Sequence, residues 1–211
     1  MKILCVSDQI DPMIYTSTVK QSFPDTLIIL SAGDLPMEYL EFITATMDKP
    51  LFYVSGNHHA GDRLNYRAGS GAEHFRAAYI DAKVRYEAGL IVAGLGGSMR
   101  YNKKENQFTE FEMSVRILKL LPSLFFNRIF RGRFLDILLT CASPLGIHDR
   151  EEKYFMGFKC FLRFMRFFKP RYLVHGHIHL YDPSEQRETK YHKTIVINAF
   201  GHCLIDTGKI H

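Results

Sequence analysis

The chain has 211 residues, of which 46% are hydrophobic, and this is enough material for one sizeable domain with its own core. A disulfide-stapled miniprotein and a disordered chain are therefore excluded. The 27 basic and 22 acidic residues give a net charge of +5. That charge favours anionic partners in general but gives no specific indication of nucleic-acid binding. We expect a single domain over residues 1–211.

Neither the cysteines nor the amino terminus indicates secretion. Cys5, Cys141, Cys160 and Cys203 lie far apart and form no CxxC pair, so no disulfide framework is expected. The first apolar run breaks at Asp8, which makes it too short for a secretion signal or a membrane span. We therefore expect a cytoplasmic protein.

Short apolar runs alternate with longer amphipathic ones along the chain. The runs predicted as strands are Lys2 to Ser7, Thr26 to Ser31, Leu51 to Ser55, Val84 to Tyr86 paired with Leu90 to Ala93, Leu135 to Thr140, Arg171 to His175, Thr194 to Asn198 and Cys203 to Asp206. The predicted helices are Pro36 to Met47, a helix that a capping box opens at Thr109 and Pro122 stops, and Tyr154 to Phe168. This order predicts a layered α/β protein with a mixed or partly antiparallel second sheet.

Several predicted strands run directly into polar residues. These clusters are Asp8, Gly33-Asp34, Gly56-Asn57-His58-His59, Cys141 and His175-Gly176-His177-Ile178-His179. Because ligand sites in open α/β sheets form at the carboxyl ends of strands, we expect these distant residues to meet at one edge.

The residue types at that edge are those that bind divalent metals. Asp, Asn and His supply oxygen and nitrogen ligands rather than a soft thiolate cluster. His177 and His179 can reach neighbouring metal positions if the backbone turns between strand and loop, and Gly176 permits that turn. Asp34 has two carboxylate oxygens and can bridge two cations.

In order and spacing, these motifs resemble those of the calcineurin-like metallophosphoesterases, whose signature is DxH, GDxx, GNH(D/E), TH-x-P and GHxH. The resemblance covers nearly the whole chain. It implies a four-layer α/β/β/α sandwich of two mixed sheets flanked by helices, with a centre of two divalent metals, commonly Mn, Fe or Zn. It also implies a hydrolase that cleaves a phosphomonoester or phosphodiester with a metal-bound hydroxide, acting on a phosphorylated small molecule or nucleotide-like substrate.

By the same resemblance, Asp8, Asp34 and His179 would hold the first metal, and Asp34, Asn57 and His177 the second. His58 would donate a proton to the leaving group or bind the scissile phosphate. Asp34 and His58 are therefore the expected catalytic residues.

The chain departs from the family pattern at three positions. Ile10 replaces the His of DxH, so the first site loses a ligand unless Asp11 or Gln9 reaches in. Cys141 stands where TH-x-P has its His, and a thiolate ligand there would favour Zn or Fe over Mn. Alternatively, Cys141 is an inert buried thiol. His59 replaces the acid that follows GNH, which would make His58 a poorer proton donor.

Two residues are expected to contact the substrate. Arg100 follows a glycine-rich turn after the strand at Leu90, where it could clamp a phosphate, and His59 lies in the GNHH cluster. The chain lacks the last glycine of GxGxxG, so a dinucleotide site is rejected.

A second function stays open from the sequence alone. The altered positions fit a non-catalytic binding or scaffold protein with an eroded metal centre. Around Phe158 to Phe168 and Arg128 to Arg133, basic residues interleave with apolar ones. A core helix with a solvated basic face explains this pattern, and so does association with an anionic membrane surface or an acidic partner.

Overall fold

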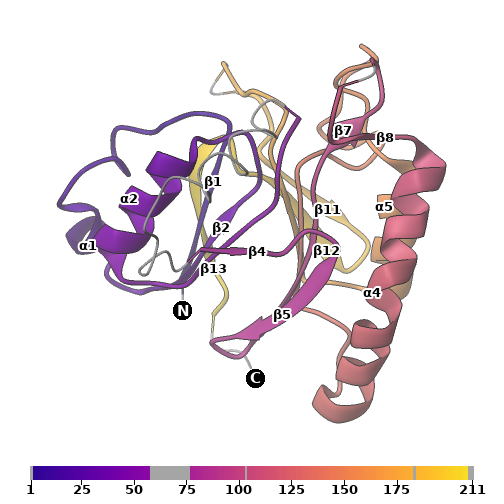
Figure 1. Cartoon of the computed structure of the whole chain (residues 1–211), viewed down its shortest axis with the longest axis horizontal. Coiled ribbons are helices and arrows are strands. Elements are labelled where there is room, and N and C mark those ends of the chain that lie inside the picture. The colour runs from indigo at the N-terminus through magenta and orange to yellow at the C-terminus, as the bar shows by residue number, and fades with distance from the viewer. Residues whose placement is uncertain (1, 58–76, 103, 183, 209–211) are drawn as a thin grey trace.

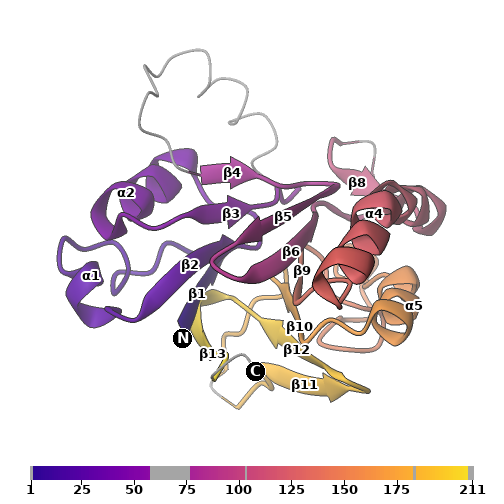
Figure 2. The same cartoon turned by 90° about the horizontal axis from the view of Figure 1, so that it is seen from below.

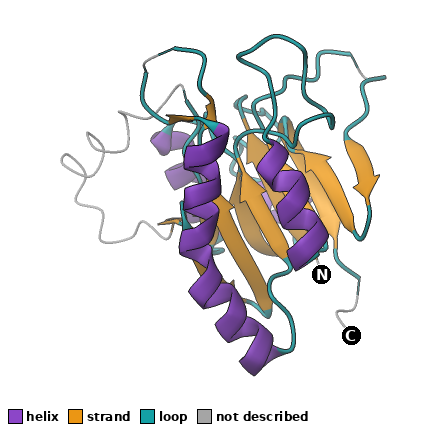
Figure 3. Ribbon diagram, turned by 90° about the vertical axis from the view of Figure 1, so that its right-hand side faces the viewer, coloured by secondary structure: helices purple, strands orange, loops and turns teal. Residues whose placement is uncertain are grey.

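The computed structural model describes residues 2–57, 77–102, 104–182 and 184–208. Within these ranges, two mixed sheets face each other between two layers of helices (Figure 1). Helices α1 (Val19–Ser22) and α2 (Met37–Met47) cover the first sheet. Helices α4 (Glu110–Arg131) and α5 (Lys159–Phe168) cover the second sheet, where they lie side by side (Figure 3). The predicted four-layer sandwich is confirmed.

The first sheet carries the amino-terminal half of the strand-end residues. Its strand order is β13 (Gly201–Asp206), β1 (Lys2–Ser7), β2 (Thr26–Ser31), β3 (Leu51–Tyr53) and β4 (Ala77–Tyr79), as Figure 2 shows. Strands β1 to β4 are parallel, whereas β13 pairs with β1 in the antiparallel sense. The carboxyl ends of β1, β2 and β3 therefore meet at one edge.

The second sheet has a parallel centre and antiparallel edges. Its order is β11 (Glu188–Tyr191), β12 (Thr194–Asn198), β10 (Tyr172–His175), β9 (Ile137–Thr140), β6 (Leu90–Leu95) and β5 (Lys83–Glu87). Strands β12, β10, β9 and β6 are parallel to one another, while β11 and β5 are antiparallel to their neighbours. The predicted β5–β6 hairpin is confirmed. Two short strands, β7 (Ser98–Met99) and β8 (Gln107–Phe108), pair separately.

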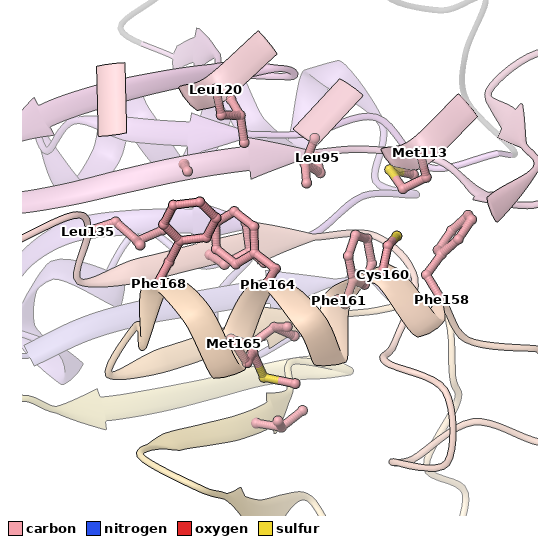
Figure 4. Close-up of a cluster of buried hydrophobic side chains, with 14 of the residues drawn as sticks. Leu95, Met113, Leu120, Leu135, Phe158, Cys160, Phe161, Phe164, Met165 and Phe168 are labelled. Atoms are coloured by element: carbon pink, nitrogen blue, oxygen red, sulfur yellow. The ribbon is translucent and has the colours of Figure 1, made fainter. Parts of the chain in front are cut away.

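Three apolar layers hold the sandwich together. One lies between the sheets and includes Ile28, Val92 and Val174. Another joins the first sheet to α2. The third joins the second sheet to α4 and α5, where buried rings and aliphatic side chains such as Phe161 and Leu120 interdigitate (Figure 4). Burial of apolar area on both faces of each sheet explains why the central strands read as unbroken apolar runs.

The prediction that Pro122 ends its helix is wrong, because α4 continues to Arg131. The capping box at Thr109 and Glu112 is present as predicted. Beyond the proline, Leu124 and Asn127 stay on the buried side of the helix, and this burial offsets the lost backbone hydrogen bond of a proline, which costs about 3 kcal/mol. Pro122 itself is exposed, on the side where a helix can bend around the core.

The predicted start of the next helix at Tyr154 is also wrong, since α5 begins at Lys159. The backbone N–H groups just before it are engaged elsewhere. That of Gly157 donates to Asp149 at 3.1 Å, and that of Phe158 donates to the carbonyl of Ser143 at 3.0 Å. A turn closed by the Phe155 N–H to the carbonyl of Glu152 at 2.8 Å precedes them, and together these contacts keep the segment out of the helix until Phe158. Within the described ranges, no helix has both the length and the apolar character needed to cross a membrane.

Candidate metal centre

The strand-end residues converge as the topology requires. Asp8 follows β1, Asp34 follows β2, Cys141 follows β9 and His177 follows β10. Backbone hydrogen bonds join neighbouring strand ends: Asp8 N–H donates to Gly33 at 3.3 Å, and Gly176 N–H donates to Cys141 at 3.0 Å. Both sheets therefore contribute to one edge of the sandwich.

Three side chains from this edge form a compact donor group. Asp34, Cys141 and His177 each offer one ligand atom, these atoms lie within 4.8 Å of one another, and all three residues are buried. Carboxylate oxygen, thiol sulfur and imidazole nitrogen together suit Zn or Fe. The donor chemistry therefore fits a divalent cation. Cys141 lies within this group, so its position fits a ligand, while its role as a ligand rather than an inert buried thiol stays a prediction.

Asn57 adds a fourth donor next to this group. Its backbone N–H, like that of Gly97, acts to lower the pKa of the Cys141 thiol and so lies beside it. Its side-chain Nδ2 donates to the hydroxyl of Tyr101 at 3.1 Å. The opposite atom, Oδ1, is buried and accepts no hydrogen bond within the described ranges. A buried carbonyl oxygen in that state is costly unless something binds it, and a cation would do so.

The ring of His177 is fixed in a tautomer that suits ligation. Its Nε2 lies 2.7 Å from the backbone carbonyl of Tyr154, so Nε2–H is the donor. In the neutral ring, Nδ1 then carries a lone pair. A backbone carbonyl is a common orienting partner of metal-binding histidines.

The backbone is strained at three of the expected ligands. Asp8, Asp34 and His177 have φ angles of 63°, 52° and 67°. Residues other than glycine uncommonly adopt the left-handed region, at a cost of about 1–3 kcal/mol each, although Asp and His do so more readily than most. At Asp8, Asp34 and His177 this backbone conformation ends the strand direction and directs the side chain toward the shared edge of the sheets.

Two glycines allow the carboxylates to approach. A Cβ atom at Gly56 would lie 2.1 Å from Cγ of Asp34, and one at Gly176 would lie 2.5 Å from Oδ2 of Asp8. No larger residue fits at either position without moving the carboxylate. The glycines of the GN and GH pairs therefore have a packing role as well as a turning role.

Asp8 lies beside the donor group. Both of its oxygens accept the backbone N–H of His177, each at 3.0 Å. Burial, with a smaller effect from the nearby charge of Asp34, raises the pKa of Asp8 to about 7, although the neighbouring Ser7 hydroxyl and the backbone N–H of His177 act to lower it. A cation would reverse this preference for the protonated form.

His179 is the outermost of the expected ligands. Its Nε2 lies 3.9 Å from Oδ1 of Asp8, its ring stacks on Phe200, and its Nδ1 lies 2.6 Å from the hydroxyl of Tyr181. The pair of Asp8 and His179 thus adjoins the donor group, with His179 partly exposed.

The gap left by Ile10 is not filled by Asp11. Ile10 is 43% exposed, and the Asp11 carboxylate instead binds Nδ1 of His202 at 2.5 Å and the backbone N–H of Met13 at 2.8 Å. Among the described residues, Ile10 and Asp11 therefore add no ligand at the position next to Asp8 and His179.

The expected substrate residues have different outcomes. The guanidinium of Arg100 forms an ion pair with Glu112 at 2.9 Å and donates to the carbonyl of Gln107. Arg100 could therefore clamp a phosphate only if that ion pair opened. His58 and His59 lie outside the described residues, so their expected roles remain predictions.

His175 supports the site without facing it. The ring is fully buried, its Nδ1 donates to the carbonyl of Gly176 at 2.9 Å, and its Nε2 lies 2.9 Å from Nδ1 of His148. Burial lowers the pKa of His175 to about 3, so the ring is neutral and accepts from His148.

The sequence did not indicate the residues that orient the ligands. Tyr101 and the backbone carbonyl of Tyr154 act on Asn57 and His177 from loops with no motif. The buried ion pair of Asp81 and Arg116 binds both backbone groups of Gly96, next to the Gly97 that contacts Cys141. The one indication of this pair in the sequence is Arg116, a charged residue at a position on the buried side of α4.

Comparison with solved structures shows the same architecture in other proteins. One crystal structure has a TM-score of 0.68 and 14% sequence identity over 97% of this chain and 94% of the other. The protein TT1561 of Thermus thermophilus has a TM-score of 0.66 and 14% identity over 95% and 89% of the two chains. At such identities the likeness shows the fold alone. No curated protein sequence matches this chain.

The family model described as calcineurin-like phosphoesterase matches residues 1–181. That span includes every strand end that contributes to the donor group and all the motifs from Asp8 to His179. The chain belongs to the calcineurin-like phosphoesterase family.

Proposed function

We propose that this protein hydrolyses a phosphomonoester or phosphodiester of a phosphorylated small molecule or nucleotide-like substrate, using divalent metal ions. The observation that carries the proposal is the donor group of Asp34, Cys141 and His177, whose ligand atoms lie within 4.8 Å of one another. Family membership supports phosphoesterase chemistry in general. The substrate and the roles of single residues are part of the proposal.

Asp34, Asn57, Cys141 and His177 would hold one cation. Asp8 and His179 would contribute to an adjacent one, with Asp34 shared between the two. Bound cations supply positive charge against the charge that develops on a phosphoryl group, and they lower the pKa of water. Tyr101 accepts a hydrogen bond from Nδ2 of Asn57, which leaves Oδ1 as the atom that would bind a cation, and the carbonyl of Tyr154 orients the ring of His177.

Proton transfer is assigned to His58, which would protonate the leaving group. It follows Asn57 directly in the chain. In the family pattern an acidic residue follows GNH and orients the catalytic histidine, whereas this chain has His59 at that position. This replacement would make His58 a weaker proton donor. We therefore expect slower turnover on poor leaving groups than on p-nitrophenolate.

The native metal should be one that accepts sulfur. Burial and the charges of Asp34 and Asp8 raise the pKa of the Cys141 thiol well above its usual value, so the metal-free site holds a neutral thiol. A cation that binds sulfur strongly is needed to displace that proton, and Zn and Fe do so better than Mn.

The test is elemental analysis of the purified protein, followed by assays with bis-p-nitrophenyl phosphate and p-nitrophenyl phosphate after reconstitution with Zn, Fe or Mn. Asp34→Asn and His177→Ala should lose bound metal and turnover. Asp48→Asn is the matched control for the first, because Asp48 also has φ = 52° but caps α2. His192→Asn, at an exposed position, is the control for the second. Turnover that both site variants retain would show that the centre lies elsewhere.

A second candidate is a binding or scaffold protein with an eroded metal centre. The exposed Ile10 and the engagement of Asp11 by His202 favour it, because both remove ligands from the position beside Asp8. It predicts no tightly bound metal after supplementation and no turnover, whereas the phosphoesterase binds metal and turns over both model substrates.

A further inference from the structure

Helix α4 has two apolar sides instead of one. Its buried side, which includes Met113, Leu120 and Leu124, faces the second sheet. On the opposite side, residues spaced by three or four positions form a second apolar stripe, interrupted only by Pro122: Phe111, Val115, Leu118, Phe125 and Ile129. These five are between 37% and 76% exposed. A surface helix normally carries polar residues there.

The apolar stripe continues across to α5. A groove of about 390 Å³ separates the two helices, and apolar side chains from both line most of it, namely Ile117, Leu118, Leu121, Phe125, Phe164 and Phe167. Phe167 on α5 is 60% exposed. The exposed stripe, the groove and Phe167 make one continuous apolar surface, which we call the α4–α5 face. Contiguous exposed apolar patches of this kind mark contact surfaces.

The charge of the chain is concentrated on the same helices. Helices α4 and α5 together contain seven Lys and Arg residues and two Glu residues, a net charge of +5. The rest of the chain has 20 basic and 20 acidic residues, a net charge of zero. The positive charge of the protein thus belongs to this side of the molecule.

Several of these cations are exposed beside the α4–α5 face. Lys119, Arg128 and Arg163 are at least partly exposed and form no ion pair within the described ranges. The two acids at the start of α4 are already engaged. Glu112 pairs with Arg100, and Glu110 accepts the backbone N–H of Lys159 at 3.1 Å. An approaching anionic surface therefore meets cations around an apolar centre.

We propose that the α4–α5 face binds the surface of a bilayer that contains anionic phospholipids. Aromatic and branched side chains on one side of a helix, bordered by Lys and Arg, allow apolar insertion below the headgroups and ion pairing at their level. Charge complementarity commits the face to an anionic bilayer, because a second copy of this chain would bring the same cations against themselves. This inference is independent of the proposed hydrolase activity.

Sedimentation with vesicles tests it. The full-length protein should pellet with vesicles of phosphatidylcholine and phosphatidylglycerol at low salt, less at high salt, and little with phosphatidylcholine alone. Lys119→Gln and Arg163→Gln should each lower the partition coefficient of the protein onto these vesicles about fivefold. This expectation follows because each basic residue near an anionic surface contributes about 1 kcal/mol to binding. The double variant Leu118→Ser, Ile129→Ser should reduce this partitioning at every salt concentration, because it removes apolar side chains that insert into the bilayer and leaves the charges unchanged.

Three control variants distinguish binding at this face from binding elsewhere on the protein. Lys20→Gln on α1 and Met13→Ser in the loop before α1, both at exposed positions, should bind as the wild type does. Asp34→Asn should also bind normally, which excludes capture of the lipid phosphate by the candidate metal centre. No pelleting at low salt, or equal pelleting of the wild type and the α4–α5 variants, would overturn the proposal. A dimer that those variants dissociate, with no vesicle binding, would assign the face to self-association and also overturn it.

Discussion

The backbone N–H of His177 donates to both carboxylate oxygens of Asp8, each 3.0 Å away, and so joins residues 169 positions apart. This contact connects the end of β1 in one sheet to the end of β10 in the other. It also holds Asp8 in a buried place where its pKa rises to about 7. Assembly of the candidate centre is therefore coupled to the packing of the two sheets and to pH.

The first prediction concerns the pH dependence of metal binding. Because the pKa of Asp8 in the metal-free protein is about 7, a cation that uses Asp8 must displace its proton at lower pH. Metal affinity should therefore rise with pH up to about 7. In Asp8→Asn the affinity should be lower, and the number of protons released below pH 7 should fall by about one. Calorimetric titration in buffers of different ionisation enthalpy measures that number. Equal proton release in both proteins would show that Asp8 is not a ligand.

The second prediction concerns the stability of the metal-free protein. The pKa of Asp8 is higher in the folded state than the usual value of an aspartate, so proton binding favours the folded state. That stabilisation is complete below about pH 4 and is lost as the pH rises to about 7. With a chelator present, the melting temperature of the wild type should fall relative to that of Asp8→Asn over this interval. A difference that stays constant from about pH 4 to about pH 8 would contradict the burial of an ionisable Asp8.

Much of this centre could be predicted from the sequence because its ligands follow strands. An apolar run that ends in Asp, GD, GN or GH indicates both the strand and the side chain that leaves it, and parallel strands bring such ends together. Asp34 and His177 were found in this way, and the structure places them in one donor group with Cys141. Two sheets of short buried strands could be predicted for the same reason.

What could not be predicted depends on contacts between segments that have no pattern of their own. The carbonyl of Tyr154 orients His177, and any residue type could supply that carbonyl. Asp11 looked available as a ligand, but its partner His202 is 191 positions away. Pro122 is a local signal for a helix end, and burial of Leu124 and Asn127 beyond it overrides that signal.

The third prediction concerns metal selectivity. If Cys141 is a ligand, Cys141→Ser replaces a soft donor by a hard one and should weaken Zn binding at least about tenfold, the lower end of what even an outer-shell change costs. Mn affinity should change much less. Cys203→Ser is the control, because that thiol lies on β13 at the far side of β1. Competition with a chromogenic chelator measures both affinities. Equal losses for Zn and Mn would mean that the substitution disturbs packing and that sulfur does not bind the metal.

The fourth prediction restores the missing ligand. Ile10 is exposed and lies two residues after Asp8, where the family pattern has a histidine. Because the carboxylate of Asp11 binds His202, it does not replace that histidine as a ligand. Ile10→His should raise the number of metals bound per chain and the rate with bis-p-nitrophenyl phosphate. Met13→His, at an exposed position nearby, should change neither. If elemental analysis gives the same metal content for all three proteins, another group already completes that position.

The fifth prediction tests the close approach of Gly56 to Asp34. In Gly56→Ala the new methyl group would lie 2.1 Å from both Cγ and Oδ1 of Asp34, so the carboxylate must leave its place. We expect a loss of about 1–3 kcal/mol in the free energy of unfolding from overpacking, together with loss of metal binding. Gly132→Ala at the end of α4 is the control, because Gly132 has φ = 75° and open space around its Cα. It should cost about 1–2 kcal/mol through the left-handed backbone alone and leave metal affinity unchanged. Chemical denaturation with and without metal separates the two effects. Metal-dependent stabilisation that survives in Gly56→Ala would show that Asp34 can bind a cation from a different position.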